Sequence, residues 1–519
     1  MSRASSLRLA LAVVLAASGC SGFLEGDGIG TDPNNPGGLK RPGPLLTGIE
    51  ALQSVQFEGQ LARNALMYAQ QVAGVSRQQI GYDRGNSSPA DIDTYFNAVY
   101  GSSRILTGGG GLLDIRKTQQ LARRLNDSLY IGIAKVYEAL VMGTAADIWG
   151  DVPYREAADS TIATPAFDPQ LQVYQDVLAQ LDSAITVFLA AQPGGTNTGP
   201  PQDGAEIIYG GRDAAGLAQV YTEVAHSLKA RFYLHLAEVD PTNYARALAE
   251  VPLGISSPAN DMLWFHDQSP TGQSVWWQFQ SARGDIAPGA ALIEVLKRRI
   301  AGGLEDDARL NYYFASGNGG TTPADFFGFR PGGATGLVAA PGVYDGTAPG
   351  GNYANFTFID GNASPGDFRH PIITWAETQL IGAEAAFQAG GQAAAQPYLD
   401  AVRGNRVYGS SGGQAVIFPP LAPVPATLQN IVEEKYVALF LNIEVWNDYK
   451  RTCLPALAPA ALAGSTQPGS TPVPGRMPYG LTETNANPNM PVVSPNGRNP
   501  NDPNACAVLD YATSTPLGN

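Results

Sequence analysis

The segment Gly409-Ser410-Ser411-Gly412-Gly413 matches the G-x-S-x-G pattern that surrounds the nucleophile of many serine hydrolases. In those enzymes the serine lies on a sharp turn between a strand and a helix, and a histidine follows later in the chain. Here all four histidines, His226, His235, His266 and His370, precede the segment. Its surroundings are rich in glycine and serine, so we interpret it as a loop without a nucleophile.

Histidine and cysteine spacing is equally unlike that of a metal site. His226 and His235 lie nine residues apart and have no glutamate at metalloprotease spacing, so we expect them on helix faces. Cys453 and Cys506 are too few and too far apart for a structural zinc site. The glycines at 108–111 are not followed by the Gly-Lys-Ser/Thr of a phosphate-binding loop. The sequence therefore predicts no metal and no cofactor.

Pairs of carboxylates are harder to exclude as catalysts. A glycosidase needs two acids about 5–10 Å apart in space, a distance that sequence does not give. Asp91 with Asp93, and the run Glu305-Asp306-Asp307, are the candidate pairs. Asp306 and Asp307 also suit an acidic helix start or a solvated turn.

Aromatic residues gather in sequence that is dense with glutamine, serine and asparagine. Aromatic faces stack on the apolar faces of sugar rings, while neighbouring amides and carboxylates hydrogen-bond the hydroxyl groups. We therefore predict that a ligand contacts Trp264, Trp276, Trp277, Phe279, Tyr82 and Asp83. The alternative is that these rings cover a helical core beneath long loops.

Composition narrows the class of ligand. The chain has 519 residues, 15% of them charged, and a net charge of −14. An acidic chain without a cluster of lysine and arginine argues against nucleic acid as a partner. Because charged residues usually make up about 25% of a chain, the surface here depends more on neutral polar and aromatic groups. Such a surface favours a neutral polar ligand.

The N-terminus predicts a lipid anchor. Arg3 and Arg8 precede a short apolar run that is too short to span a bilayer, as in a secretory signal. Ala17-Ser18-Gly19-Cys20 then resembles a bacterial lipobox, in which the cysteine is lipidated and becomes the mature N-terminus. In an oxidising envelope Cys453 and Cys506 could form a disulfide, and two free thiols are the alternative.

Apolar residues at three- and four-residue spacing predict the elements that must position these side chains. We expect helices at 45–75, 89–104, 118–149, 169–189, 214–237, 243–250, 289–301, 372–389, 392–403 and 425–449. Strand signal is thin, and residues 383–402 resemble a tetratricopeptide helix hairpin. The fold class predicted is therefore all-α, with such hairpins forming a curved scaffold that carries long Gly/Pro/aromatic-rich loop insertions.

The same patterns divide the chain into regions. They predict a signal peptide at 1–19, a lipidated tether at 20–44, an N-terminal helical region at 45–255, a loop-rich insertion bearing the ligand face at 256–366, a C-terminal helical region at 367–452, and a Pro/Asn-rich tail at 453–519 that packs on the same domain.

Four stretches resemble motifs of the SusD/RagB family, in the family's order. The first, Cys20 to Glu25 with Thr31 to Pro36, resembles the tether that follows the lipobox, and the second, Ala146-Asp147-Ile148-Trp149-Gly150-Asp151-Val152-Pro153-Tyr154, is similar to the family's "LYGDVPY" turn. The third, Glu433 to Phe440 continued by Glu444 to Thr452, is similar to the family's late helix. The fourth, Arg476-Met477-Pro478-Tyr479 with Asn485 and Asn487, is similar to its closing motif. The chain departs from the family at Gly480, where proline is usual, and in its longer Gly/Pro-rich middle.

The resemblance implies a surface-exposed lipoprotein of the bacterial outer membrane. Such a protein caps a SusC-like TonB-dependent transporter and captures an oligosaccharide or peptide for import, without catalysis. The family's motifs are mostly structural, so Asp151, Trp446 and Arg451 are expected to pack helix ends. Ligand residues vary within the family, so none is carried over.

Two other functions remain open from the sequence. One is an envelope-anchored α-helical glycoside hydrolase or lyase that uses the carboxylate pairs. The other is a structural or protein-binding lipoprotein that uses the concave side of the helical scaffold.

Overall fold

A computed structural model describes residues 41–101, 109–190, 204–297, 307–331, 352–360, 364–457 and 473–491, with a short strand pair at 509–510 and 515–516. The chain divides into residues 1–42 and 43–519, and every described helix and strand belongs to the second unit. The predicted signal peptide and Cys20 lie outside the described residues.

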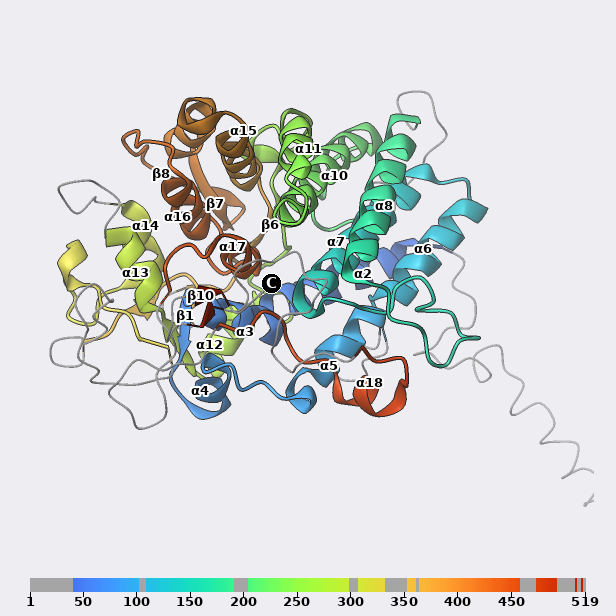
Figure 1. Ribbon diagram of the computed structural model, residues 1–519, viewed down its shortest axis with the longest axis horizontal. Coiled ribbons are helices and arrows are strands. Elements are labelled where there is room, and N and C mark those ends of the chain that lie inside the picture. Colours follow the sequence, from blue (N-terminus) through green and yellow to red (C-terminus); the bar gives the residue numbers. More distant parts are fainter. Residues whose placement is uncertain are drawn as a thin grey trace, which may run out of the picture. The chain divides into compact units, whose positions relative to one another are not determined.

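Helices that follow one another in the chain pack side by side through much of the second unit (Figure 1). This row consists of α6 (Leu112–Arg124), α7 (Ser128–Trp149), α8 (Gln170–Ala190), α10 (Ala214–Leu236), α11 (Thr242–Glu250) and α15 (Trp375–Gly404). Within α15, Gly391 has φ 72° and joins two helical segments, as the Gly390-Gly391 pair predicts. The all-α prediction with tetratricopeptide-like hairpins is confirmed.

The central helix of this row is α7, which contacts α2, α5, α6, α8 and α10. It begins after Asp127, whose carboxylate accepts a hydrogen bond from the Tyr130 amide at 3.3 Å, and it ends at Gly150 with φ 83°. Among the described helices it is the one long and apolar enough to cross a membrane, but 89% of its apolar window is buried in the protein. A helix that is apolar on all sides and buried this way is a core helix.

The remaining helices surround this row and carry the loops. They are α2 (Gly43–Glu58), α3 (Gln60–Tyr68), α4 (Arg77–Asp83), α5 (Pro89–Tyr100), α12 (Val275–Ala282), α13 (Ala290–Lys297), α14 (Ala308–Tyr313), α16 (Leu428–Ala438), α17 (Glu444–Thr452) and α18 (Leu481–Ala486), with 3-10 turns at Val251–Leu253, Pro258–Asn260 and Pro323–Asp325.

Strands occur in the described residues as antiparallel pairs. These are β1 (Val72–Gly74) with β3 (Ile286–Pro288), β2 (Met262–Leu263) with β6 (Pro371–Ile373), β4 (Phe314–Ala315) with β5 (Asn355–Phe356), β7 (Arg406–Ser411) with β8 (Gln414–Phe418), and β9 (Leu509–Asp510) with β10 (Thr515–Pro516). The register places Val72 opposite Pro288 and Met262 opposite Ile373, so these pairs fasten the loop-rich middle to distant segments.

Three predicted helices are divided in the structure. The helix expected at 45–75 breaks at Gly59, the one at 118–149 breaks at Asn126 with φ 53°, and the one at 425–449 breaks near Leu441 with φ 63°. In each case the apolar period continues across the break because both helices face the same core. At Asn126 and Leu441 a single residue lies in the left-handed region, and at Gly59 the backbone is extended, with φ −84° and ψ −150°. Periodicity reveals neither kind of break.

Close packing in the row depends on glycines of α7. A Cβ on Gly143 would lie 2.2 Å from Phe232 Cζ of α10, and one on Gly132 would lie 2.3 Å from Phe188 Cε1 of α8. These contacts are far shorter than real Cβ contacts, so a larger residue would push the helices apart.

We therefore expect Gly143→Ala to lower the free energy of unfolding by about 1–3 kcal/mol, because the added methyl group overpacks the core. Gly48 provides the matched control, since it is exposed in α2 and a Cβ there meets nothing within 4 Å. Gly48→Ala should raise stability by about 0.5–1 kcal/mol through a better helix propensity. Urea unfolding measures both, and equal effects of the two substitutions would contradict the packing described.

Candidate functional site

The motif stretches of the sequence meet in a buried network of ion pairs. Arg231 of α10 holds Glu377 of α15 through two contacts of 2.7 Å, and its Nη1 lies 3.7 Å from Glu444 Oε1 of α17. The three residues are at most 1% exposed. Removing one partner from such a buried pair leaves an uncompensated charge, so the network fixes how these helices pack.

A second part of the network holds α17 against α15 and α16. Arg451 contacts Glu384 at 2.5 Å and Asp448 at 2.9 Å, and Lys435 contacts Asp448 at 2.8 Å. Burial by itself would raise the pKa of Asp448, but Lys435 and Arg451 outweigh it and the pKa is lowered. Asp448 is therefore an anion paired with two cations inside the protein.

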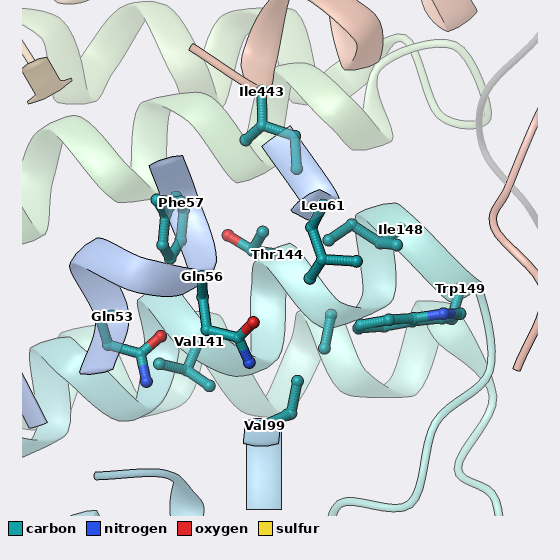
Figure 2. Close-up of a pocket in the computed structure, with 11 residues that line it drawn as sticks. Gln53, Gln56, Phe57, Leu61, Val99, Val141, Thr144, Ile148, Trp149 and Ile443 are labelled. Atoms are coloured by element: carbon teal, nitrogen blue, oxygen red, sulfur yellow. The ribbon is translucent and has the colours of Figure 1, made fainter. Parts of the chain in front are cut away.

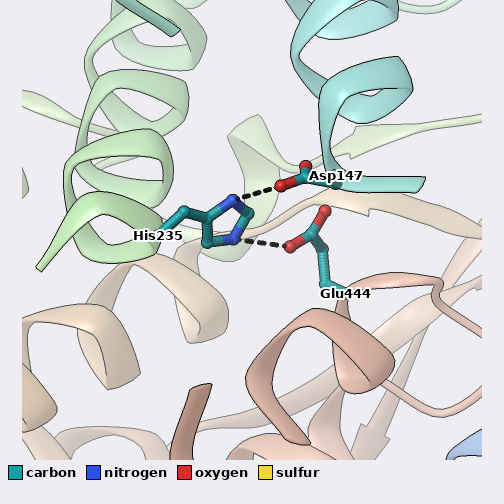
Figure 3. Close-up of side chains that lie close together, drawn as sticks. All are labelled: Asp147, His235 and Glu444. Atoms are coloured by element: carbon teal, nitrogen blue, oxygen red, sulfur yellow. Dashed lines mark ion pairs between the residues drawn. The ribbon is translucent and has the colours of Figure 1, made fainter. Parts of the chain in front are cut away.

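His235 of α10 lies between two carboxylates of this network (Figure 3). Its Nδ1 is 2.8 Å from Asp147 Oδ1 of α7, and its Nε2 is 3.1 Å from Glu444 Oε2. Burial alone would lower the pKa of His235, but the two carboxylates outweigh it and raise the pKa to about 9. The ring is therefore an imidazolium at neutral pH.

The ligand atoms of Asp147, His235 and Glu444 lie within 4.8 Å of one another, so they form a candidate metal site. Each ring nitrogen, however, faces a different carboxylate, whereas a metal ion binds one nitrogen of a histidine. The Tyr174 hydroxyl also donates to Asp147. This arrangement is that of a charged histidine bridging two acids, and we interpret it as an ion-pair centre.

The segment of the closing motif packs on the turn motif at 146–154 and on the late-helix motif through a tryptophan of each. Trp149 Nε1 donates to the Pro478 carbonyl at 3.0 Å, and Trp446 Nε1 donates to the Pro474 carbonyl at 2.9 Å. The Tyr479 hydroxyl donates to the Asp151 carbonyl at 2.8 Å. Trp149 and Trp446 are fully buried, so these motif residues hold the frame together and offer no surface to a ligand.

A cavity lies between α2, α3, α5 and α7 (Figure 2). Its volume is about 20 Å³, which is room for about one water molecule and too small for a sugar ring. It is lined by Gln53, Gln56, Phe57, Leu61, Val99, Val141, Thr144, Ala145, Ile148, Trp149 and Ile443. We regard it as a packing gap of the core.

An open cleft of about 390 Å³ lies beside the Val152-Pro153-Tyr154 turn. Its charged groups already pair with one another, since Arg116 Nε lies 3.3 Å from Glu138 Oε1 and Arg155 Nε lies 2.8 Å from Asp176 Oδ2. The aromatic residue of its lining, Tyr154, is buried, so this cleft is a weaker candidate for a sugar than the surface around α12.

The carboxylates considered for catalysis make structural contacts. Asp91 caps the start of α5 at Ser88 and accepts the Tyr82 hydroxyl at 2.7 Å, while Asp93 accepts the Thr482 amide at 2.6 Å. Asp307 contacts Arg309 at 2.8 Å, and Glu305 and Asp306 lie outside the described residues.

Ser411 lies at the end of β7, next to the turn of the β7–β8 hairpin, which is not a strand-to-helix elbow. Its hydroxyl donates to Asp367 Oδ1 at 2.8 Å. The interpretation of this segment as lacking a nucleophile agrees with that geometry.

A surface that we call the loop face surrounds α12. It consists of residues 264–282, residues 364–369 and the hairpin turn at 410–412. Trp277 Nε1 donates to the Ser364 carbonyl at 2.8 Å, and the Ser274 amide donates to the Gly366 carbonyl at 2.8 Å. Asp367 accepts hydrogen bonds from Gln268 at 2.9 Å and from Ser411, so three segments distant in sequence form one surface.

Glu58 at the end of α2 fastens this surface to the helical core. Its carboxylate is fully buried and accepts the Val275 amide at 3.1 Å and His266 Nε2 at 3.0 Å. Because Val275 is the first residue of α12, the negative charge also lies at the positive end of the helix dipole. Burial would lower the pKa of His266, but Glu58 outweighs it and the pKa is raised.

The structure corrects the prediction for four of the six aromatic and acidic candidates. Trp264 and Trp276 are 0% and 1% exposed and point into the core, and Tyr82 and Asp83 are also buried. A tryptophan on the inner side of α12 has no free face for a sugar. Trp277 and Phe279 are partly exposed and remain proposed contacts.

Two arginine–aromatic pairs of this surface were missed from the sequence. The Arg63 guanidinium lies 4.0 Å from the ring centroid of Phe279, and that of Arg369 lies 4.4 Å from the ring of Phe265. The two residues of each pair lie about one hundred or more positions apart in the chain, so sequence spacing gave no signal. Cys453 is disulfide-bonded, and its predicted partner Cys506 lies outside the described residues.

The chain belongs to the SusD-like family, whose model, described as starch-binding associating with outer membrane, matches residues 41–480. The SusD/RagB resemblance is thereby confirmed. No curated protein matches the chain.

Solved structures of the same family share the fold. A SusD/RagB family protein from Bacteroides thetaiotaomicron is 18% identical, covers 86% of this chain and 95% of its own, and has a TM-score of 0.62. A SusD homologue from Bacteroides fragilis is 17% identical, with coverage of 86% and 94% and a TM-score of 0.62. A chitin-binding SusD homologue from Flavobacterium johnsoniae is 18% identical, with coverage of 86% and 92% and a TM-score of 0.59.

We expect His235→Gln to lower the free energy of unfolding by about 3–5 kcal/mol at pH 6.5, because Asp147 and Glu444 lose their shared cation. The pKa of His235 is raised in the folded state to about 9, so its contribution is complete below its unfolded pKa of 6.5 and is lost as pH rises towards 9. Urea unfolding across this pH range should show wild-type stability falling more steeply than that of the variant.

His226→Gln is the control, since His226 pairs with Glu250 at 2.6 Å near the surface. Its loss should be smaller. A His235→Gln variant with unchanged stability and an unchanged pH profile would contradict the ion-pair interpretation.

Proposed function

We propose that this protein is a surface-exposed outer-membrane lipoprotein that binds a glycan or other nutrient oligomer. It delivers this ligand to a SusC-like TonB-dependent transporter and is not an enzyme. The observation that carries the proposal is the match of residues 41–480 to a family of starch-binding, outer-membrane-associated proteins. The chitin-binding homologue with the same fold supports a glycan.

The loop face supplies chemistry that suits a sugar chain. Trp277 and Phe265 are partly exposed rings, and Gln268 and Gln278 are exposed amides on the same surface. Rings can stack on the apolar faces of sugars while the amides bond hydroxyl groups.

Structural use of the acids supports a binding role without turnover. Asp91, Asp93 and Asp307 each hold helix ends or neighbouring segments through the contacts given above. A general acid needs a carboxyl group that faces the substrate. These three face their own structural partners.

We expect glycan binding to depend on Trp277. Wild-type protein should bind at least one oligosaccharide in a panel that includes chitin and starch fragments, and Trp277→Ala should weaken that binding about tenfold by removing a stacking face. Isothermal titration measures both, and Phe387→Ala, at a partly exposed ring on α15, is the control. Equal affinities of the two variants would remove Trp277 from the site, and no binding by wild type would contradict the function.

We expect Cys20→Ser to move the protein from the membrane to the soluble fraction, because the lipid chains that supply the anchor are lost. Fractionation of the native host checks this outcome. Wild-type protein extracted in mild detergent should co-purify with a TonB-dependent barrel. Retention of the variant in the membrane, or repeated recovery of a different partner, would contradict the proposed anchor and delivery role.

A further inference from the structure

Arg63 of α3 is a buried cation that has no acidic partner among the described residues. It is 7% exposed, and among the described residues it makes no ion pair within 4.0 Å. Its hydrogen bonds are long, 3.4 Å from Nε to Gln60 Oε1 and 3.4 Å from Nη1 to the Glu58 carbonyl. Its guanidinium also lies over the Phe279 ring, 4.0 Å from the ring centroid. Buried charges in proteins are normally paired, so this one is an exception.

A second guanidinium lies on the same side. Arg283 follows Phe279 by four residues and ends α12, where its amide donates to the Phe279 carbonyl at 3.0 Å, so it lies one helical turn further along. The side chain of Arg283 is 46% exposed, and its one carboxylate contact in the described residues is a distant one, 3.8 Å to Asp285. Burial, together with a smaller effect of Arg283, lowers the pKa of Arg63 to about 10, and Tyr95 partly opposes this.

We propose that Arg63, which lies over the Phe279 ring, and Arg283, one turn further along at the end of α12, form a subsite for a carboxylate of the ligand. The nutrient oligomer is accordingly an acidic glycan, such as one that contains uronic acid residues. This inference rests on the proposed function and narrows the class of ligand.

The chemistry of the two side chains selects a carboxylate. A planar guanidinium presents parallel N–H donors that match the two oxygens of a carboxylate, and such charge-assisted bonds are about twice as strong as neutral ones. The anion would also relieve repulsion between the two cations. The Phe279 ring packs against the Arg63 guanidinium and holds its plane, so its N–H donors are oriented before a ligand binds.

The test compares matched ligands that differ in charge alone. Isothermal titration of the full chain would use a panel of uronate-containing oligosaccharides, the same oligosaccharides after carboxyl reduction, and neutral chitin and starch fragments. We expect the tightest ligand to be a uronate, its affinity to fall about tenfold or more on carboxyl reduction, and Arg63→Gln and Arg283→Gln each to give a similar loss.

Variants and controls separate this inference from the proposed function. Arg283 is exposed, so Arg283→Gln should fold even if Arg63→Gln does not, and Arg155→Gln in the distant cleft should leave affinity unchanged. Binding of neutral or carboxyl-reduced glycans as tightly as acidic ones would overturn the subsite and leave the proposed function intact. No binding of any oligosaccharide in the panel would contradict both the subsite and the proposed function.

Discussion

The bridge that His235 makes between Asp147 and Glu444 is the interaction on which the rest of the fold depends. It joins the end of α7, the centre of the helical row, to α10 and to the start of α17. An isolated charge in this core would cost several kcal/mol, so the three groups are stable only together. The need to keep them paired fixes the relative positions of segments that lie about three hundred residues apart in the chain.

The same frame sets where the loop face can form. The network holds α15 and α17, and β6 immediately before α15 pairs with β2 at the start of the loop-rich middle. From the other side Glu58 holds the first residue of α12 and the ring of His266. Loops that contain many glycines and prolines are thus tied at both ends to rigid elements, which is how a surface on loops keeps a defined shape.

Much of the architecture follows from local sequence. The helices at 170–190, 214–236 and 242–250 agree closely with the apolar period, and the turn in α15 follows from Gly390-Gly391. The breaks at Asn126 and Leu441 do not, because a single residue with positive φ leaves the period intact. The SusD/RagB resemblance rests on motif residues that are buried and hold the helices together. The apolar period alone does not account for these residues.

The binding surface was predictable only as a region. Composition identified the middle of the chain, but neighbouring tryptophans on α12 face opposite ways, and sequence did not tell that Trp276 is buried while Trp277 is partly exposed. The Arg63–Phe279 contact joins residues more than two hundred positions apart, so no local signal for it exists. Low overall charge favoured a neutral ligand, whereas the proposed subsite of Arg63 and Arg283 favours an acidic one.

Hydrogen–deuterium exchange with and without a bound oligosaccharide tests the central claim, that the loop face is where the nutrient binds. The account predicts ligand-induced protection in residues 264–282 and 364–369, with little change in α7, α10 and α17, whose amides are already protected by the buried network. Protection confined to the cleft around Arg116 and Asp176, with the loop face unchanged, would contradict it.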